Sequence, residues 1–298
     1  MAERAFKEIF SNAYSRARGG EDLAKSVQLR ESRGFGIQAG ASLGHPDFEH
    51  LQVGQTAMGL GVVFFLDIRG FTKLSFVLPN EELLAILQAL TMASVVSVLQ
   101  FGGHVIEFTG DGIMAVFGDA RTLAEAAALS ALHTTAFLMK GIRDDVNPLL
   151  LRSGTEAVRT GVGMEFGQIL WSRIGLLGNT QVKPISEATF LAGKLSSGKF
   201  TAAWESKVGA ELANWIPEEF KVSAGEYRFT LDKRTYSRDL YVFGWERFGQ
   251  AYQSQAETLK GRMLARKLAP ISIASAVRTV SPAAATAAPR KLKDQPFF

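Results

Sequence analysis

The chain has 298 residues, of which 47% are apolar, and this content is enough to bury a sizeable hydrophobic core. It contains no cysteine, so disulfides, thiolate zinc sites and cysteine nucleophiles are excluded. The net charge of +4 is modest, and the basic residues are not interleaved with aromatic ones along one patch. Nucleic acid is therefore not indicated as a partner.

The sequence gives no sign of a targeting or membrane segment. Its first 20 residues mix charges of both signs with the apolar residues, unlike a secretory signal. No uninterrupted apolar run reaches the roughly 20 residues that a membrane span requires. These features predict a cytoplasmic protein that does not cross a membrane.

Composition divides the chain into three regions. Residues 1–55 combine a short amphipathic helix pattern with a glycine-rich stretch, which predicts an N-terminal extension. Residues 56–246 have the apolar periodicity of a folded domain. Residues 247–298 predict a C-terminal helix and a disordered tail, because the Ala/Pro/Lys-rich end lacks the apolar residues to fold alone.

The central region alternates between strand and helix patterns. A β-rich run at 61–68 predicts a strand, and a helix should follow over 80–99 with Asn80 as its cap. The next patterns predict a hairpin at 104–118, an Ala-rich helix at 122–140, a second hairpin formed by the runs 159–167 and 168–175, a helix at 187–195, and strands at 226–232 and 240–245. This order predicts an α+β fold with helices packed on a mostly antiparallel sheet.

Two acidic residues lie where predicted strands stop. Asp67 ends the first strand, and Asp111 lies at the tip of the first hairpin. Each residue alone is more often a turn or cap residue. If the first strand lies beside this hairpin, however, the carboxylates meet at one end of the sheet, and a hard divalent cation would relieve their repulsion. The glycine turn at Gly70 offers backbone N–H groups that suit phosphate oxygens.

The stretches FFLDIRGFTKLS and EFTGDGIMAVFG closely resemble the two metal-binding motifs of class III nucleotide cyclases. The resemblance extends over residues 62–195, and it implies that 56–246 is a nucleotide cyclase catalytic domain with a ferredoxin-like α+β sandwich. It further implies a head-to-tail homodimer with active sites in the dimer cleft. By motif match, Asp67, Asp111 and the Ile68 carbonyl would bind two divalent cations, Mn²⁺ or Mg²⁺.

The same resemblance implies which residues bind the substrate. Gly70, Phe71 and Thr72 would hold the triphosphate, and Phe64 of the preceding strand belongs to the substrate-binding set. The later family motif is altered here. In ISEATFLAGKL, Phe190 takes the place of the Asn that orients the ribose, and Lys194 takes the place of the transition-state Arg. A lysine keeps the charge but lacks the planar, bidentate fork of arginine.

Glu107 and Lys183 fall at the two positions that select the base in this family. A carboxylate at Glu107 disfavours adenine, whose N1 is an acceptor. Uracil fits both residues, because Glu107 can accept from N3–H while Lys183 donates to a carbonyl. Guanine also satisfies Glu107, so the residues leave UTP and GTP open, and Lys183 as a solvated loop residue is equally compatible.

The intact metal half, the altered second half and the short chain together resemble the bacterial pyrimidine cyclases of the Pycsar antiphage system. This resemblance implies a cyclase that makes cUMP or cCMP, with the product acting on a separate cyclic-nucleotide-binding effector. Of the two, a uridylate cyclase that makes cUMP from UTP is favoured, because cytosine's N3 is an acceptor that would face Glu107 unfavourably, with only partial compensation from its amino group. The alternatives are a guanylate cyclase and a catalytically degenerate domain that only binds nucleotide.

Overall fold

The computed structural model describes residues 2–19, 43–119, 122–176, 178–231 and 234–254, all within a compact unit that spans residues 1–268. The last residues described, 245–254, are helical. The disordered tail expected toward residue 298 lies outside the described residues, and so does the middle of the expected N-terminal extension.

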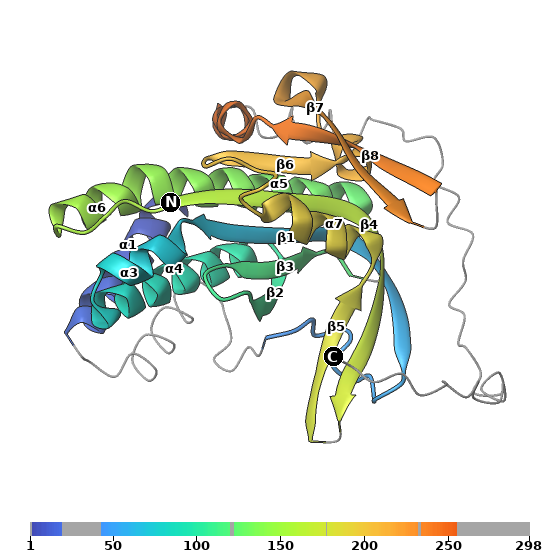
Figure 1. The fold of residues 1–298 in the computed structure, drawn as a ribbon, viewed down its shortest axis with the longest axis horizontal. Helices are drawn as coiled ribbons and strands as arrows, with labels where there is room; N and C mark the ends of the chain where they lie inside the picture. The colour runs from blue at the N-terminus through green and yellow to red at the C-terminus, as the bar shows by residue number, and fades with distance from the viewer. Residues whose placement is uncertain (1, 20–42, 120–121, 177, 232–233, 255–298) are drawn as a thin grey trace. The chain divides into compact units, whose positions relative to one another are not determined.

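An eight-stranded sheet forms the centre of the fold, in the order β2-β3-β1-β4-β6-β8-β7, with β5 pairing with β4 outside this path (Figure 1). Its pairings are antiparallel except for the parallel pair β4 and β6. The strands are β1 (Thr56–Arg69), β2 (Gly103–Phe108), β3 (Ile113–Phe117), β4 (Arg159–Leu176), β5 (Asn179–Ile185), β6 (Glu205–Gly209), β7 (Lys221–Leu231) and β8 (Arg234–Phe243).

Helices cover both faces of this sheet. They are α1 (Ala2–Arg18), α3 (Phe71–Val77), α4 (Asn80–Gln100), α5 (Ala124–Lys140), the π-helix η1 (Gly141–Val146), α6 (Asn147–Arg152), α7 (Glu187–Ser196), α8 (Ala210–Ala213) and the 3-10 turn η2 (Glu218–Phe220). The mixed architecture with a mostly antiparallel sheet confirms the predicted α+β fold class.

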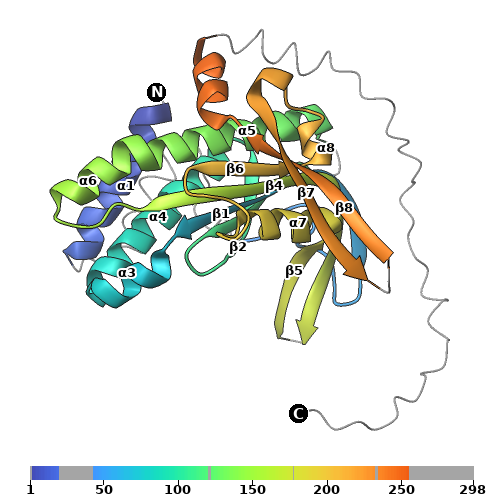
Figure 2. The ribbon, with the colours of Figure 1, turned by 45° about the horizontal axis from the view of Figure 1, so that its top comes forward.

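The two faces of the sheet follow from the alternation of side chains along β1. Phe64 and Leu66 join the larger core with α1, α4 and α5, whereas Val63 and Phe65 contribute to a smaller core beneath α7. Asp67 has the same parity as Val63 and Phe65 and so belongs to the face that α7 covers. Figure 2 shows α7 lying across β1 and β4.

Two expectations about secondary structure are wrong. The runs 159–167 and 168–175 form one continuous strand, β4, because Gly167 takes an extended conformation opposite Gly61 of β1 instead of turning. The hairpin partner of β4 is β5, which the sequence analysis missed. Asn80 is the first residue of α4 and not its cap; Pro79 occupies the cap position, and no side chain caps the helix there.

Helix α1 is part of the main core. Its Phe6 is buried against Gly141 of the π-helix, where a Cβ would lie 2.7 Å from the Phe6 ring. The hydroxyl of Tyr14 donates to Glu82 of α4, and Thr155 also donates to Glu82 at 2.7 Å. These contacts tie the start of the chain to the start of α4.

In the described part of the chain, α4 is the one helix long and apolar enough to cross a membrane, with a mean hydropathy of 1.9. The helix is not an uninterrupted apolar run, because Gln88, Thr91 and Ser94 lie within it. A core helix has the same character, and α4 packs against α1, α5 and β2. The length and hydropathy of α4 are therefore weak evidence for a membrane span.

The close approach of α7 to β4 depends on Gly163. A Cβ at this position would lie 2.2 Å from the Ala192 carbonyl oxygen and 2.3 Å from the Ser196 nitrogen, both backbone atoms. We expect Gly163→Ala to lower the free energy of unfolding by about 1–3 kcal/mol, because α7 must move outward. Denaturant unfolding measures the change. Gly198→Ala is the control, since its Cβ meets only Arg69 Cδ at 3.9 Å; an equal loss in both variants would contradict this interpretation.

Candidate active site

The end of β1 lies directly against the tip of the β2–β3 hairpin. In the β1–β3 register Leu66 pairs with Ile113, so Asp67 and Asp111 both lie just beyond the last paired residues. Gly112 makes this approach possible, because a Cβ there would lie 2.0 Å from the Leu66 carbonyl oxygen. The prediction that the first strand lies beside this hairpin is confirmed.

The two carboxylates share a half-buried environment. Burial raises the pKa of Asp67, the neighbouring Arg69 charge lowers it, and the Asp111 charge raises it. Burial also raises the pKa of Asp111, while its own backbone N–H and Arg69 lower it. The pKa values of both carboxyl groups stay raised despite Arg69, so their negative charge is only partly compensated within the chain, and a bound cation would complete the compensation.

Arg69 is a site residue that the sequence analysis did not single out. Its guanidinium forms an ion pair with Asp67, and its Nε and Nη2 atoms are buried without a partner in the described structure. Two positions after Asp67 in the same strand, it lies on the same face of β1. This spacing from Asp67, together with the opposite charge of Arg69, was the signal in the sequence that could have identified Arg69 as a site residue.

The donor set fits a hard divalent cation held in part by its substrate. Among the residues that the structure describes, no group of three or more His, Cys, Asp or Glu side chains could hold a metal ion. Asp67 and Asp111 therefore supply two carboxylates, and further oxygen ligands would come from a backbone carbonyl or from phosphates. Mg²⁺ is commonly bound by such a sparse carboxylate set together with substrate phosphates.

Gly70 turns the chain from β1 into α3. Its φ of 75° lies in the left-handed region, which glycine adopts without strain. Its carbonyl accepts the N–H groups of Lys73 at 2.9 Å and Leu74 at 3.1 Å, so the first N–H groups of α3 have no partner within the helix. Thr72 is exposed at this turn, while Phe71 is half-buried against the main core.

Phe64 does not reach this site. Its side chain is completely buried in the main core and packs edge-to-face against Phe117, with the ring centroids 6.0 Å apart. The alternation of β1 directs it to the face opposite that of Asp67. Its inclusion among the substrate-binding residues was therefore wrong.

The two candidate base-selecting residues lie together in one chain. The ammonium group of Lys183, on β5, lies 2.5 Å from a carboxylate oxygen of Glu107, on β2. Both side chains remain partly exposed, at 21% for Lys183 and 42% for Glu107. Lys183 is thus a paired strand residue and not a solvated loop lysine. The pair presents a hydrogen-bond donor beside an acceptor.

Phe190 and Lys194 project from α7, whose first turn is capped by the Ser186 hydroxyl. Phe190 is 70% exposed, and the Lys194 ammonium lies 5.8 Å from the centre of the Phe200 ring. In the described residues, no hydrogen bond or ion pair joins either side chain to Asp67 or Asp111. Within one chain, therefore, the Lys194 ammonium is not bonded to either carboxylate.

A second residue missed by the sequence analysis, this one acidic, lies beneath α7. Glu165 of β4 is only 4% exposed, and its carboxylate accepts the N–H groups of Phe166 at 2.8 Å and Leu212 at 2.9 Å. Burial raises the pKa of Glu165 to about 7, although these two N–H groups lower it. Its signal in the sequence was a lone acid within an apolar strand.

The raised pKa of Glu165 makes stability depend on pH. Between about pH 4.5, where an ordinary glutamate ionises, and about pH 7, the folded protein keeps a proton that the unfolded chain has lost. Stability should therefore fall as the pH rises through this window, by at most about 1.4 kcal/mol per pH unit. Glu165→Gln should remove this slope in unfolding measurements, whereas Glu156→Gln, at an exposed position before β4 that does not influence the Glu165 pKa, should keep it. Parallel slopes in both variants would contradict the assignment.

The sheet and the helices on its two faces have the fold of nucleotide cyclase domains. The structure is similar to the crystal structure of the adenylyl cyclase CyaB from P. aeruginosa, with a TM-score of 0.56 and 22% identity, covering 63% of this chain and 95% of that chain. It is also similar to the guanylyl cyclase Cya2, with a TM-score of 0.54 and 20% identity, covering 64% of this chain and 94% of that chain. At these identities the likeness shows the fold alone.

In sequence, the chain is similar to two Escherichia coli proteins named cytidylate cyclase, 26% identical over 159 residues and 29% identical over 194 residues. These matches cover 51% and 61% of this chain, but the chain spans only 34% and 42% of the length of those relatives. An adenylate cyclase of Anabaena cylindrica is 23% identical over 150 residues, which are 49% of this chain and 29% of that protein. No family model matches the chain. These relatives support the class III nucleotide cyclase superfamily.

Proposed function

We propose that this chain is the catalytic domain of a class III nucleotide cyclase. It converts a pyrimidine nucleoside triphosphate, UTP in the first place, to the 3′,5′-cyclic monophosphate and pyrophosphate. The observation that carries the proposal is the convergence of Asp67 and Asp111 at the junction of β1 with the β2–β3 hairpin. The cyclase fold and the cyclase relatives support it.

Asp67, Asp111 and the Ile68 carbonyl would hold two divalent cations, Mn²⁺ or Mg²⁺. When bound, these cations supply activation of the substrate's 3′-hydroxyl and neutralisation of the leaving pyrophosphate. The N–H groups at Gly70, Phe71 and Thr72 bind the triphosphate oxygens and orient the α-phosphorus toward that hydroxyl. Catalysis by the chain's own residues is then mainly positioning and charge stabilisation.

The ion pair of Glu107 and Lys183 supports a pyrimidine base. With uracil, Glu107 accepts from N3–H and Lys183 donates to a carbonyl. Cytosine is the second candidate, because two relatives are named cytidylate cyclase. Its amino group could donate to Glu107 while Lys183 donates to N3. Guanine also presents an N–H beside a carbonyl, at N1 and O6, so product identity must separate it from uracil.

Two copies of the chain complete each site in this proposal. Among the described residues, no hydrogen bond or ion pair joins Phe190 or Lys194 to the carboxylates of their own chain. In the proposal, α7 of a second copy would bring Lys194 to the triphosphate and Phe190 to the ribose or base. Lys194 would act there as a point charge. The cyclic product would serve as a second messenger for a separate effector in antiphage defence, as the resemblance to the Pycsar cyclases implies.

The test is product identification by mass spectrometry after incubation with ATP, GTP, CTP or UTP in Mn²⁺. We expect cUMP as the main product, with Asp67→Asn lowering its formation on the order of a hundredfold or more because one metal carboxylate is lost. Asp239→Asn, at an exposed position of β8, is the matched control and should remain active. Formation of cCMP would select the second candidate, and cGMP alone would overturn the pyrimidine assignment. Nucleotide binding without product would indicate a degenerate domain.

The shared site predicts complementation between two inactive chains. Asp67→Ala and Lys194→Ala damage opposite halves of each site, so a mixed dimer retains one intact site. With random exchange of chains, an equimolar mixture should recover roughly a quarter of the wild-type rate. Each variant assayed alone sets the baseline. Activity no higher than this baseline, in a mixture shown to contain mixed dimers, would rule out the shared site.

A further inference from the structure

The hairpin formed by β4 and β5 reaches β2 without forming a sheet with it. β5 pairs with β4 only, yet two of its alternate residues contact β2 through their side chains. Gln181 and Lys183 lie on the same face of β5 because they are two residues apart. Lys183 contacts Glu107, and Gln181 contacts the residue before it, Ile106.

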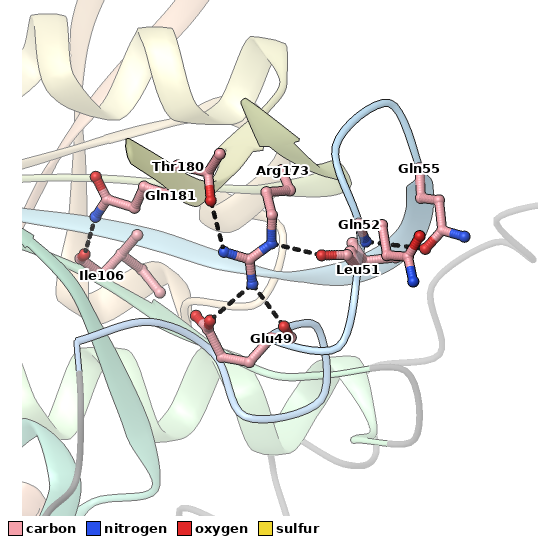
Figure 3. A network of polar contacts seen from close by, with 8 residues as sticks. All are labelled: Glu49, Leu51, Gln52, Gln55, Ile106, Arg173, Thr180 and Gln181. Atoms are coloured by element: carbon pink, nitrogen blue, oxygen red, sulfur yellow. Dashed lines mark hydrogen bonds and ion pairs between the residues drawn. The ribbon is translucent and has the colours of Figure 1, made fainter. Parts of the chain in front are cut away.

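Ile106 is the bulged residue of β2. The β2–β3 register passes from Val105, opposite Ala115, to Glu107, opposite Met114, and leaves Ile106 without a partner on β3. The Gln181 side-chain amide donates to the Ile106 carbonyl at 3.2 Å (Figure 3). Gln181 therefore satisfies a backbone group that the bulge would otherwise leave without a strand partner.

Arg173 of β4 fixes the outer part of the same hairpin. Its guanidinium donates to the Leu51 carbonyl at 2.5 Å, to the Glu49 carbonyl at 2.6 Å and to the Thr180 hydroxyl at 3.3 Å (Figure 3). A further contact of 3.2 Å joins it to the Glu49 carboxylate. These bonds hold the hairpin against the segment that precedes β1, so the remaining freedom of β5 lies in its approach to β2.

We infer that Gln181 is a specificity-determining positioning residue, which sets the separation of Lys183 from Glu107 through its bond to the bulged Ile106 carbonyl. It does not touch the base itself. Without this bond, the distance between the Lys183 ammonium and the Glu107 carboxylate is no longer fixed. The fixed arrangement of donor and acceptor that distinguishes the bases is then lost. This inference rests on the proposed function, because it assigns Glu107 and Lys183 to base recognition.

The test compares Gln181→Met with Gln52→Met in the full chain. Methionine keeps an unbranched side chain of similar length but has no N–H to donate. Gln52 is the matched control, because it lies in the same network but contributes only backbone atoms there: its N–H donates to the Gln55 side chain, and its carbonyl accepts from the Gln55 N–H. Values of kcat and KM are measured for all four nucleoside triphosphates, and their affinities by equilibrium titration in the same samples.

We expect Gln181→Met to reduce the ratio of kcat/KM between the preferred nucleotide and the other three by about three- to tenfold. The change should lie in KM, with kcat for the preferred nucleotide within about twofold of wild type, because Gln181 contacts neither the carboxylates nor the Gly70 turn. Gln52→Met should keep the wild-type ratio.

Gln181→Glu provides a second variant of the same size. Its carboxylate cannot donate to Ile106 and competes with Glu107 for Lys183, so it should also reduce discrimination; it decides the question if Gln181→Met does not fold. An unchanged ratio in an active, folded variant, or an equal fall in kcat for every nucleotide, would overturn the inference. A wild-type chain without turnover would overturn the proposed function instead, and the four binding affinities would then test Gln181 independently.

Discussion

The antiparallel pairing of β1 with β3 fixes the position of both acidic side chains. Asp67 follows the last paired residues of β1, and Asp111 lies in the turn beside them. Gly112 is essential to this contact, since a side chain there would collide with the Leu66 carbonyl. The cost of bringing two half-buried carboxylates together is reduced within the chain by Arg69. This balance favours a bound cation at the same point.

The other half of the candidate site depends on α7 and on how closely it approaches the sheet. Gly163 lets the backbone of α7 lie directly on β4, so that Leu191 and Leu195 are buried while Phe190 and Lys194 point outward. The exposed side chains of Phe190 and Lys194 are then available to another molecule. Helix α7 thus has one face buried against the sheet and one exposed face, which carries the residues assigned to the substrate in the proposed function.

The proposed base-recognition pair, Glu107 and Lys183, is the part of the candidate site with the least support from regular backbone pairing. Glu107 and Lys183 lie on strands that do not pair with each other, 76 positions apart in the chain. Side-chain hydrogen bonds position these strands instead. Gln181 donates to the carbonyl of the bulged residue in β2, and Arg173 holds the β4–β5 hairpin. Under the proposed function, a change in such contacts would alter base selection without altering the sheet.

The sequence by itself determined the α+β class, the first hairpin, the helices around α4 and α7, and the pairing of Asp67 with Asp111, because each depends on local periodicity, turn residues or a short connection. It did not determine that β4 is one strand through Gly167, that Phe64 is buried, or that Arg69 neutralises Asp67. It also could not reveal the Glu165 carboxylate beneath α7 or the bridge from Gln181 to Ile106. Only the tertiary structure decided these, because they arise from contacts between segments far apart in the chain and from the burial those contacts create.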